Sequence, residues 1–151
     1  MPVRCEVVTQ DRLLFEGPAD IVLAPGVQGE LGILPNHAPL LTSLDLGVLR
    51  LRYHGQETAF TISGGVMEVR PDVVIVLADV GESVEDIDQE RAEKARARAE
   101  ELLKRVEGKS PEEYLAAEAA LRRSKLRLEA VRRYRHSTRR HPTTGTDEGR
   151  S

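Results

Sequence analysis

The chain has 151 residues, of which 31% are charged and 3% aromatic, and its formal net charge is −3. This length allows one or two small domains, and a single cysteine, Cys5, excludes a disulfide framework and a thiolate metal cluster. No run of about 18 apolar residues occurs and residues 1–10 lack the apolar core of a signal peptide, so we expect membrane association only through a partner.

The charge is unevenly distributed along the chain. Residues 1–83 carry a net charge of −6, residues 84–109 carry −1, and residues 110–151 carry +4. An acidic first part and a basic last part either attract each other or bind different partners. The alternative is that two solvated surfaces merely differ in charge.

Short apolar stretches separated by turn residues dominate the first half. Residues 54–56 predict a hairpin connection, and Val73–Ala78 is continuously apolar, which predicts a strand covered on both faces. Short strands at this spacing favour a β-sandwich over βαβ units. The other predicted strands are Val3–Val7, Asp20–Ala24, Leu49–Tyr53, Thr58–Ile62 and Met67–Arg70.

The pattern changes to helical spacing at Asp86–Ala92. Gly108 is a typical helix end, and Ser110 followed by Pro111 is a typical helix start. The short connection between them predicts an antiparallel hairpin. The apolar stripe of the first helix is Ala92, Ala95, Ala99, Leu102 and Val106, and that of the second is Ala117, Leu121, Ser124, Leu128 and Val131.

The sequence therefore predicts an α+β chain with a β-sandwich over residues 1–84, a helical hairpin over 85–135 and a disordered tail over 136–151. The helical stripes are mostly alanine, and alanine contacts bury little apolar area. Weak docking allows the hairpin to change position, with two states separated by a few kcal/mol. A permanently docked hairpin is the alternative.

The expected signatures of an enzyme or a metal site are missing from the sequence. The glycines of Gly26–Gly32 lack the Gly-Lys-Ser/Thr ending of a phosphate-binding loop, and the segment is better interpreted as a β-turn. The histidines have no ligand spacing, and no nucleophile, histidine and carboxylate form a recognisable pattern. We expect a protein that is not an enzyme, with no metal and no required cofactor.

The second predicted helix carries a basic face. With only 2 Phe, 3 Tyr and no Trp, the chain offers few aromatic rings for stacking on bases, and its overall charge is negative, so we expect no nucleic-acid partner. An acidic protein or the phosphates of a nucleotide are the favoured ligands of this face. Its residues include Arg122, Arg123, Lys125 and Arg127.

Four ordered blocks of this sequence resemble the epsilon subunit of bacterial F-type ATP synthases. The resemblance covers about residues 3–135, and Asn36 stands where that family usually has Gly. The blocks are Gly29–Thr42, Ser63–Gly65 with Glu68–Val69, Val76–Asp79, and Ile87–Ala92, which is similar to the I/L-D-x-x-R-A element of the family.

This resemblance implies a sandwich of about ten strands and a non-catalytic subunit of the central rotor stalk on the cytoplasmic face of the plasma membrane. The sandwich is expected to bind the gamma subunit and the c-ring, the latter through exposed Glu30 and His37, although His37 has an alternative role in capping its own turn. The hairpin is expected to restrain ATP hydrolysis. Its basic residues Arg122, Arg123, Lys125 and Arg127 would then contact an acidic segment of the beta subunit in the alpha/beta catalytic head.

The resemblance also implies ATP as a regulatory ligand, and an ATP sensor whose occupancy is the main output is the alternative function. Asp88 has a second possible role as a helix cap, and Arg91 has one in a surface ion pair. The residues expected to bind the nucleotide are Glu82, Ile87, Asp88, Arg91, Ala92, Arg98, Arg123 and Arg127.

Overall fold

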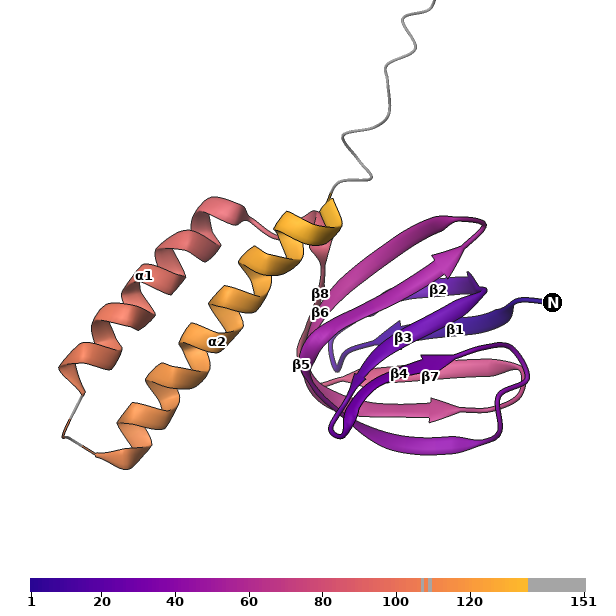
Figure 1. Ribbon diagram of the computed structural model, residues 1–151, viewed down its shortest axis with the longest axis horizontal. Coiled ribbons are helices and arrows are strands. Elements are labelled where there is room, and N and C mark those ends of the chain that lie inside the picture. The colour runs from indigo at the N-terminus through magenta and orange to yellow at the C-terminus, as the bar shows by residue number, and fades with distance from the viewer. Residues whose placement is uncertain (107, 109, 136–151) are drawn as a thin grey trace, which may run out of the picture.

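A β-sheet platform is followed by two helices that lie side by side in a computed structural model, which describes residues 1–106, 108 and 110–135 (Figure 1). The hairpin consists of α1 (Gln89–Arg105) and α2 (Pro111–Tyr134), and the 3₁₀ turn η1 (Val84–Asp86) precedes it. The platform strands are β1 (Val3–Val8), β2 (Leu13–Ala19), β3 (Ile21–Gly26), β4 (Gly29–Ile33), β5 (Leu40–Tyr53), β6 (Gln56–Val69), β7 (Val73–Ala78) and β8 (Gly81–Ser83).

The strands pair in the order β2-β1-β7-β6-β5-β3-β4, with β8 added to β6. β1 and β7 are parallel and the other pairs are antiparallel. The sheet curls so that β2 contacts β5 and β8, which encloses a core between two layers. Its largest fully buried side chains include Phe60, Ile33, Leu49, Ile62 and Met67.

The structure confirms the predicted α+β architecture, but its described residues form eight strands where about ten were expected. The difference comes from β5 and β6, which each run for 14 residues. Gly64 (φ 78°) and Gly65 (φ 136°) interrupt the regular pleat of β6 without ending the strand. A Cβ atom at Gly65 would lie 2.3 Å from the Leu77 carbonyl oxygen, so only glycine fits there.

Two tight turns bear out the sequence analysis. His54 (φ 51°) and Gly55 (φ 77°) connect β5 to β6 as the expected hairpin turn. The segment Gly26–Gly29 closes the β3–β4 hairpin, so the first part of the glycine-rich stretch is the expected turn, whereas its second part belongs to β4. Asn36 has φ 64°, and Asn tolerates this conformation at a position where the family usually has Gly.

The expectation that Val73–Ala78 is covered on both faces is wrong for the chain alone. Alternate residues of β7 are buried, whereas Leu77 is 49% exposed, because the outer face of the platform has no second layer over β7 among the described residues. The strand registers place Leu13, Val8, Leu77 and Val66 directly opposite one another on β2, β1, β7 and β6. These four residues are called the apolar row below.

The helices begin as predicted. Asp88 caps α1, and the Ser110 hydroxyl accepts hydrogen bonds from the N–H groups of Glu112 and Glu113 at the start of α2. Gly108 has φ 79°, in agreement with a helix-ending glycine. Residues 107 and 109 of the predicted connection, and the predicted tail 136–151, lie outside the described residues.

The predicted apolar faces of both helices are buried or half-buried, with one exception on α1, and α2 has a second buried face that was not predicted. Leu102 is 47% exposed, and Leu103, one residue on, is half-buried instead. Ala117, Ser124 and Val131 are buried on α2 as expected. Ala130 is also buried, against the platform, so the last turns of α2 pack on two sides.

It is α2 that attaches the hairpin to the platform (Figure 1). Ala130 and Val131 form an apolar cluster with Ala59 of β6 and with Val84 and Ile87 of the linker, the segment 84–88 that joins β8 to α1 and includes η1. Partly buried Val48, Leu128 and Tyr134 pack around it. The contact consists mainly of small side chains, so it stabilises docking less than a large core does.

Candidate functional site

A cleft of about 450 Å³ lies where β8, the linker, α1 and α2 meet. Each of these segments contributes at least one polar or charged side chain, so the site exists only when the hairpin is folded against the platform. The cleft is lined by Glu82, Asp86, Ile87, Asp88, Arg91, Ala92, Ala95, Arg98 and Arg127.

The first turn of α1 builds one wall of the cleft. The Asp88 carboxylate accepts a hydrogen bond of 3.0 Å from the Arg91 N–H, which is the capping role weighed in the sequence. Arg91, Ala95 and Arg98 follow at helical spacing and therefore share one face. The small Ala95 between the two arginines leaves room for a ligand beside the helix.

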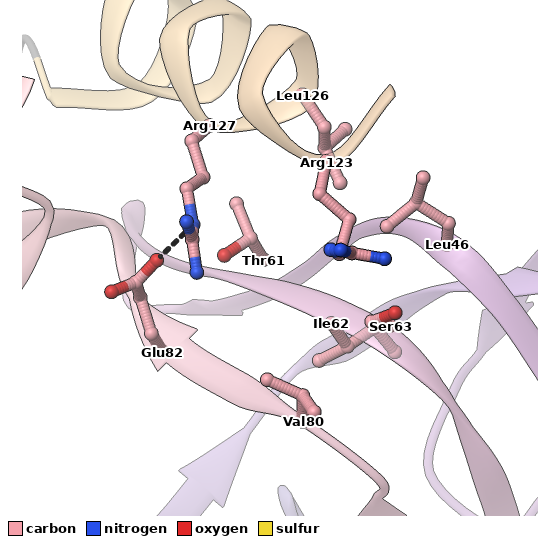
Figure 2. A pocket seen from close by; sticks show the side chains of 9 residues that line it. All are labelled: Leu46, Thr61, Ile62, Ser63, Val80, Glu82, Arg123, Leu126 and Arg127. Atoms are coloured by element: carbon pink, nitrogen blue, oxygen red, sulfur yellow. Dashed lines mark ion pairs between the residues drawn. The ribbon is translucent and has the colours of Figure 1, made fainter. Parts of the chain in front are cut away.

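Three carboxylates and three guanidinium groups line the cleft, and the arginines of α1 are the groups suited to an anion. Arg127 Nε lies 2.8 Å from Glu82 Oε1, which makes an ion pair across the α2–β8 contact (Figure 2). Within the described residues, neither Arg91 nor Arg98 has a carboxylate oxygen within 4.0 Å, so the surface pairing considered for Arg91 does not occur there. Two exposed guanidinium groups without a counter-ion suit phosphate oxygens, which accept bidentate hydrogen bonds.

Arg123 is the one predicted nucleotide-binding residue that does not line this cleft. It lines a neighbouring cavity of about 20 Å³ with Glu82, Arg127, Thr61 and other platform residues. Figure 2 shows the Arg123 and Arg127 side chains reaching from α2 toward the platform. This smaller cavity has space for about one water molecule, so it cannot itself hold a nucleotide.

The four basic residues expected to contact the catalytic subunit divide between two sides of α2. Arg123 and Arg127 are turned to the platform. Arg122 and Lys125 line an open groove of about 730 Å³ together with Arg96 of α1. Arg122, Arg123 and Lys125 are exposed, whereas Arg127 is half-buried and paired with Glu82, so the four residues have different environments while α2 lies on the platform.

The two residues expected at the c-ring have different environments. Glu30 is exposed, as expected, and its carboxylate lies 3.3 Å from Arg50 Nη2. His37 is half-buried, contrary to the expectation of an exposed side chain. The ring nitrogen Nδ1 of His37 lies 2.7 Å from the Ala38 carbonyl oxygen, and the backbone N–H of His37 donates a hydrogen bond to the Leu34 carbonyl oxygen. These contacts correspond to the alternative role, in which His37 caps its own turn.

Sequence reasoning missed two residues of the cleft, Asp86 and Ala95. Ala95 could have been found from helical spacing, since it lies four residues after Arg91. Asp86 ends η1, and nothing in the sequence signals that this turn faces α1. Among the described residues no group of three His, Cys, Asp or Glu side chains is arranged to hold a metal ion.

Comparison with known proteins identifies the family. The profile "ATP synthase, Delta/Epsilon chain, beta-sandwich domain" matches residues 2–84, and "ATP synthase, Delta/Epsilon chain, long alpha-helix domain" matches residues 85–132. The chain belongs to the ATP synthase delta/epsilon chain family. The family profiles agree with the resemblance carried by the four sequence blocks.

Relatives of this delta/epsilon chain extend over most of its length. The ATP synthase epsilon chain of Herpetosiphon aurantiacus is 43% identical over 132 residues, which cover 87% of this chain and 96% of that protein. The epsilon chain of Pelotomaculum thermopropionicum is 50% identical over 100 residues, 66% of this chain and 75% of that protein. The chain is therefore an epsilon subunit of an F-type ATP synthase by its sequence relationships.

Solved structures agree with the fold. A chain in the Euglena gracilis mitochondrial ATP synthase, solved as OSCP/F1/c-ring, aligns with a TM-score of 0.73 at 25% identity over 85% of this chain and 80% of that chain. A chain in the Tetrahymena thermophila central stalk and c-ring aligns with a TM-score of 0.56 at 15% identity, over 87% and 97% respectively, and this likeness concerns the fold alone. None of the described helices is long and apolar enough to cross a membrane.

Proposed function

We propose that this epsilon subunit is a non-catalytic part of the central rotor stalk, which couples the catalytic head to the c-ring and restrains ATP hydrolysis through its hairpin. The platform would bind the gamma subunit and the c-ring on the cytoplasmic face of the plasma membrane. Its family membership and the OSCP/F1/c-ring assembly that contains its Euglena gracilis relative support this role.

The observation that carries the regulatory part is the position of α2. Arg123 and Arg127 are turned to the platform, and the apolar contact that holds α2 there is built mainly from small residues. An acidic segment of the beta subunit would replace Glu82 as the partner of Arg127 once α2 leaves the platform. Long-range attraction between opposite charges would then steer the released hairpin to that partner.

The apolar row is the surface best suited to the gamma subunit. Leu13 is 53% exposed, Leu77 49% and Val66 40%, and they lie side by side across the outer face of the sheet. Contiguous apolar surface of this kind is typical of a permanent protein contact. Glu30 remains the proposed c-ring contact, while His37 would contribute mainly by fixing the shape of the neighbouring turn.

ATP sensing is the second candidate, and the cleft favours it. Seven of the eight residues expected to bind ATP line this one cleft, although they come from β8, the linker and both helices. Arg91, Arg98 and Arg127 would neutralise the triphosphate. Because the cleft needs the folded hairpin, bound ATP would favour the compact state by its difference in affinity between the two states.

Calorimetric titration of the purified full chain with ATP tests the cleft. We expect saturable binding by the wild type and a decrease in affinity of about tenfold for Arg91→Ala, because one charge-assisted contact to phosphate is lost. Arg105→Ala is the matched control, since Arg105 lies on the same helix, pairs with Glu101 at 2.8 Å and is not part of the cleft. No saturable heat for the wild type at millimolar ATP would rule out the sensor.

A further inference from the structure

The residue that follows α2 binds the backbone of the interdomain linker. Arg135 Nη2 donates a hydrogen bond of 2.6 Å to the carbonyl oxygen of Val84 and a second one to the carbonyl oxygen of Ile87. These carbonyls lie at the start of η1 and just after it. One guanidinium group therefore joins the C-terminal end of the hairpin to the segment from which the hairpin begins.

Neighbouring side chains reinforce this contact. The Tyr134 ring lies 5.5 Å from the guanidinium carbon of Arg50 on β5. The Arg50 side chain is only 17% exposed and is held by Glu30 and Glu57, so the cation under the ring has a fixed position. Ala130 and Val131, one turn earlier, are buried against Val84 and Ile87.

The same linker also lines the nucleotide cleft. Ile87 lines the cleft, and the neighbouring Asp88 caps α1 by accepting a hydrogen bond from the Arg91 N–H. The Ile87 N–H itself donates to the Val84 carbonyl oxygen at 3.3 Å, so Arg135 binds both ends of this small turn. Arg135 therefore contacts the backbone directly before Asp88.

We propose that Arg135 is a latch that holds the end of α2 on the linker and positions the linker for nucleotide binding. This inference rests on the proposed nucleotide cleft for its second half only. Without the latch, Val84 and Ile87 lose a charged donor, the end of α2 separates more often from the platform, and the wall of the cleft that contains Ile87 and Asp88 is less fixed. Arg135 thus acts on the ligand through the linker, as a positioning residue.

The test uses the full chain and two variants of equal charge. Arg135→Ala removes the latch, whereas Arg133→Ala removes a guanidinium two residues earlier that is 62% exposed and pairs with Glu129 at 2.8 Å. Amide hydrogen exchange without nucleotide reports on the latch, because the N–H groups of Ile87 and Arg91 both donate within the linker region. ATP titration reports on positioning.

We expect amide exchange at Ile87 and Arg91 to be about tenfold faster in Arg135→Ala than in the wild type, with affinity for ATP about tenfold weaker, and both values unchanged in Arg133→Ala. Arg135→Lys keeps the positive charge but loses the planar guanidinium group. Its amide exchange rates and its affinity for ATP should therefore lie between those of Arg135→Ala and the wild type. Circular dichroism of each variant establishes that both helices remain folded.

The possible failures are distinguishable. Wild-type exchange rates in Arg135→Ala would overturn the latch, whatever the affinity for ATP. Faster exchange with unchanged affinity for ATP would overturn the positioning role. If the wild type binds no ATP, the nucleotide cleft fails together with the positioning role, while faster exchange in Arg135→Ala would still support the latch on α2.

Discussion

Individual charged residues of this chain have roles set by what lies within hydrogen-bond distance, and not by residue type alone. Asp88 caps a helix, Glu82 pairs with Arg127, and Glu30 holds Arg50 beneath Tyr134. Arg91 has no carboxylate within 4.0 Å in the described part of the chain. Two of the carboxylates that line the cleft, Glu82 and Asp88, are engaged by Arg127 and by the Arg91 N–H, which leaves the guanidinium groups of Arg91 and Arg98 as the best-suited anion-binding groups of the proposed site.

Cys5 gives a prediction that belongs to the residue scale. It has no exposed surface, and burial, with the charge of Glu6 as the smaller cause, raises the pKa of its thiol from 9.0 to about 12. The folded chain keeps this proton where the unfolded chain loses it, so the thiol lowers the free energy of unfolding as pH rises from about 9 toward 12, by about 1.4 kcal/mol per pH unit.

Comparison with Cys5→Ala isolates this contribution from the other groups that titrate at high pH. Urea unfolding between pH 8 and 10.5 should give a difference between wild type and variant that shrinks as pH rises, because only the wild type loses the stability of a buried neutral thiol. Parallel curves for the two proteins would contradict the assignment.

At the scale of single elements, α2 packs against more of the molecule than α1 does, because it contacts both α1 and the platform. It buries Ala117 and Ser124, and it packs on the platform through Ala130. The Ser124 hydroxyl donates to the Ala120 carbonyl oxygen at 2.9 Å, so this buried polar group is satisfied inside the helix. The helix can therefore present apolar surface to two neighbours without leaving that hydroxyl unpaired.

The cap of α2 provides the prediction for this scale. Replacing Ser110 by Ala removes the acceptor for the N–H groups of Glu112 and Glu113, which lie 3.2 and 3.4 Å from its hydroxyl. Loss of such a cap costs about 1 kcal/mol, so amide exchange in the first two turns of α2 should be about fivefold faster. Amides of β5 and β6 serve as the internal control, and equal acceleration there would indicate a global effect instead.

The whole molecule combines an acidic platform with a basic α2. Residues 1–83 carry a net charge of −6, whereas α2 has six basic and four acidic side chains, and the ion pair of Glu82 with Arg127 is a direct contact between the two. The ion pair adds to the apolar contact that holds α2 on the platform, and under the proposed function an acidic surface of a partner would compete with Glu82 for Arg127.

Deletion of residues 89–151 tests the regulatory role at this scale. All eight strands and η1 remain in the shortened chain, so we expect it to assemble into the ATP synthase while ATP hydrolysis by the complex increases several-fold. Hydrolysis is measured on the purified complex, with subunit content checked by gel electrophoresis. Loss of assembly would instead make the hairpin a structural element, and unchanged hydrolysis would favour the permanently docked alternative.

The sequence by itself determined the succession of elements and the family. Alternating apolar residues define the strands, Ser110-Pro111 and Gly108 define the helix ends, and the segment Ile87–Ala92 identifies the start of the hairpin, because each of these signals acts over a few neighbouring residues. The residues of the cleft could be named only through the family resemblance, since no spacing rule joins Glu82 to Arg98.

Only the tertiary structure decided which surfaces those elements present. The exposure of Leu77, the half-buried state of His37 and the choice of Leu103 over Leu102 depend on which segments pack against which. Arg123 and Arg127 line a different cavity from Arg122. The contact of Arg135 with Val84 joins residues that lie 51 positions apart in the chain. Such contacts follow from the docking of α2 on the platform, and local sequence patterns contain no information about that docking.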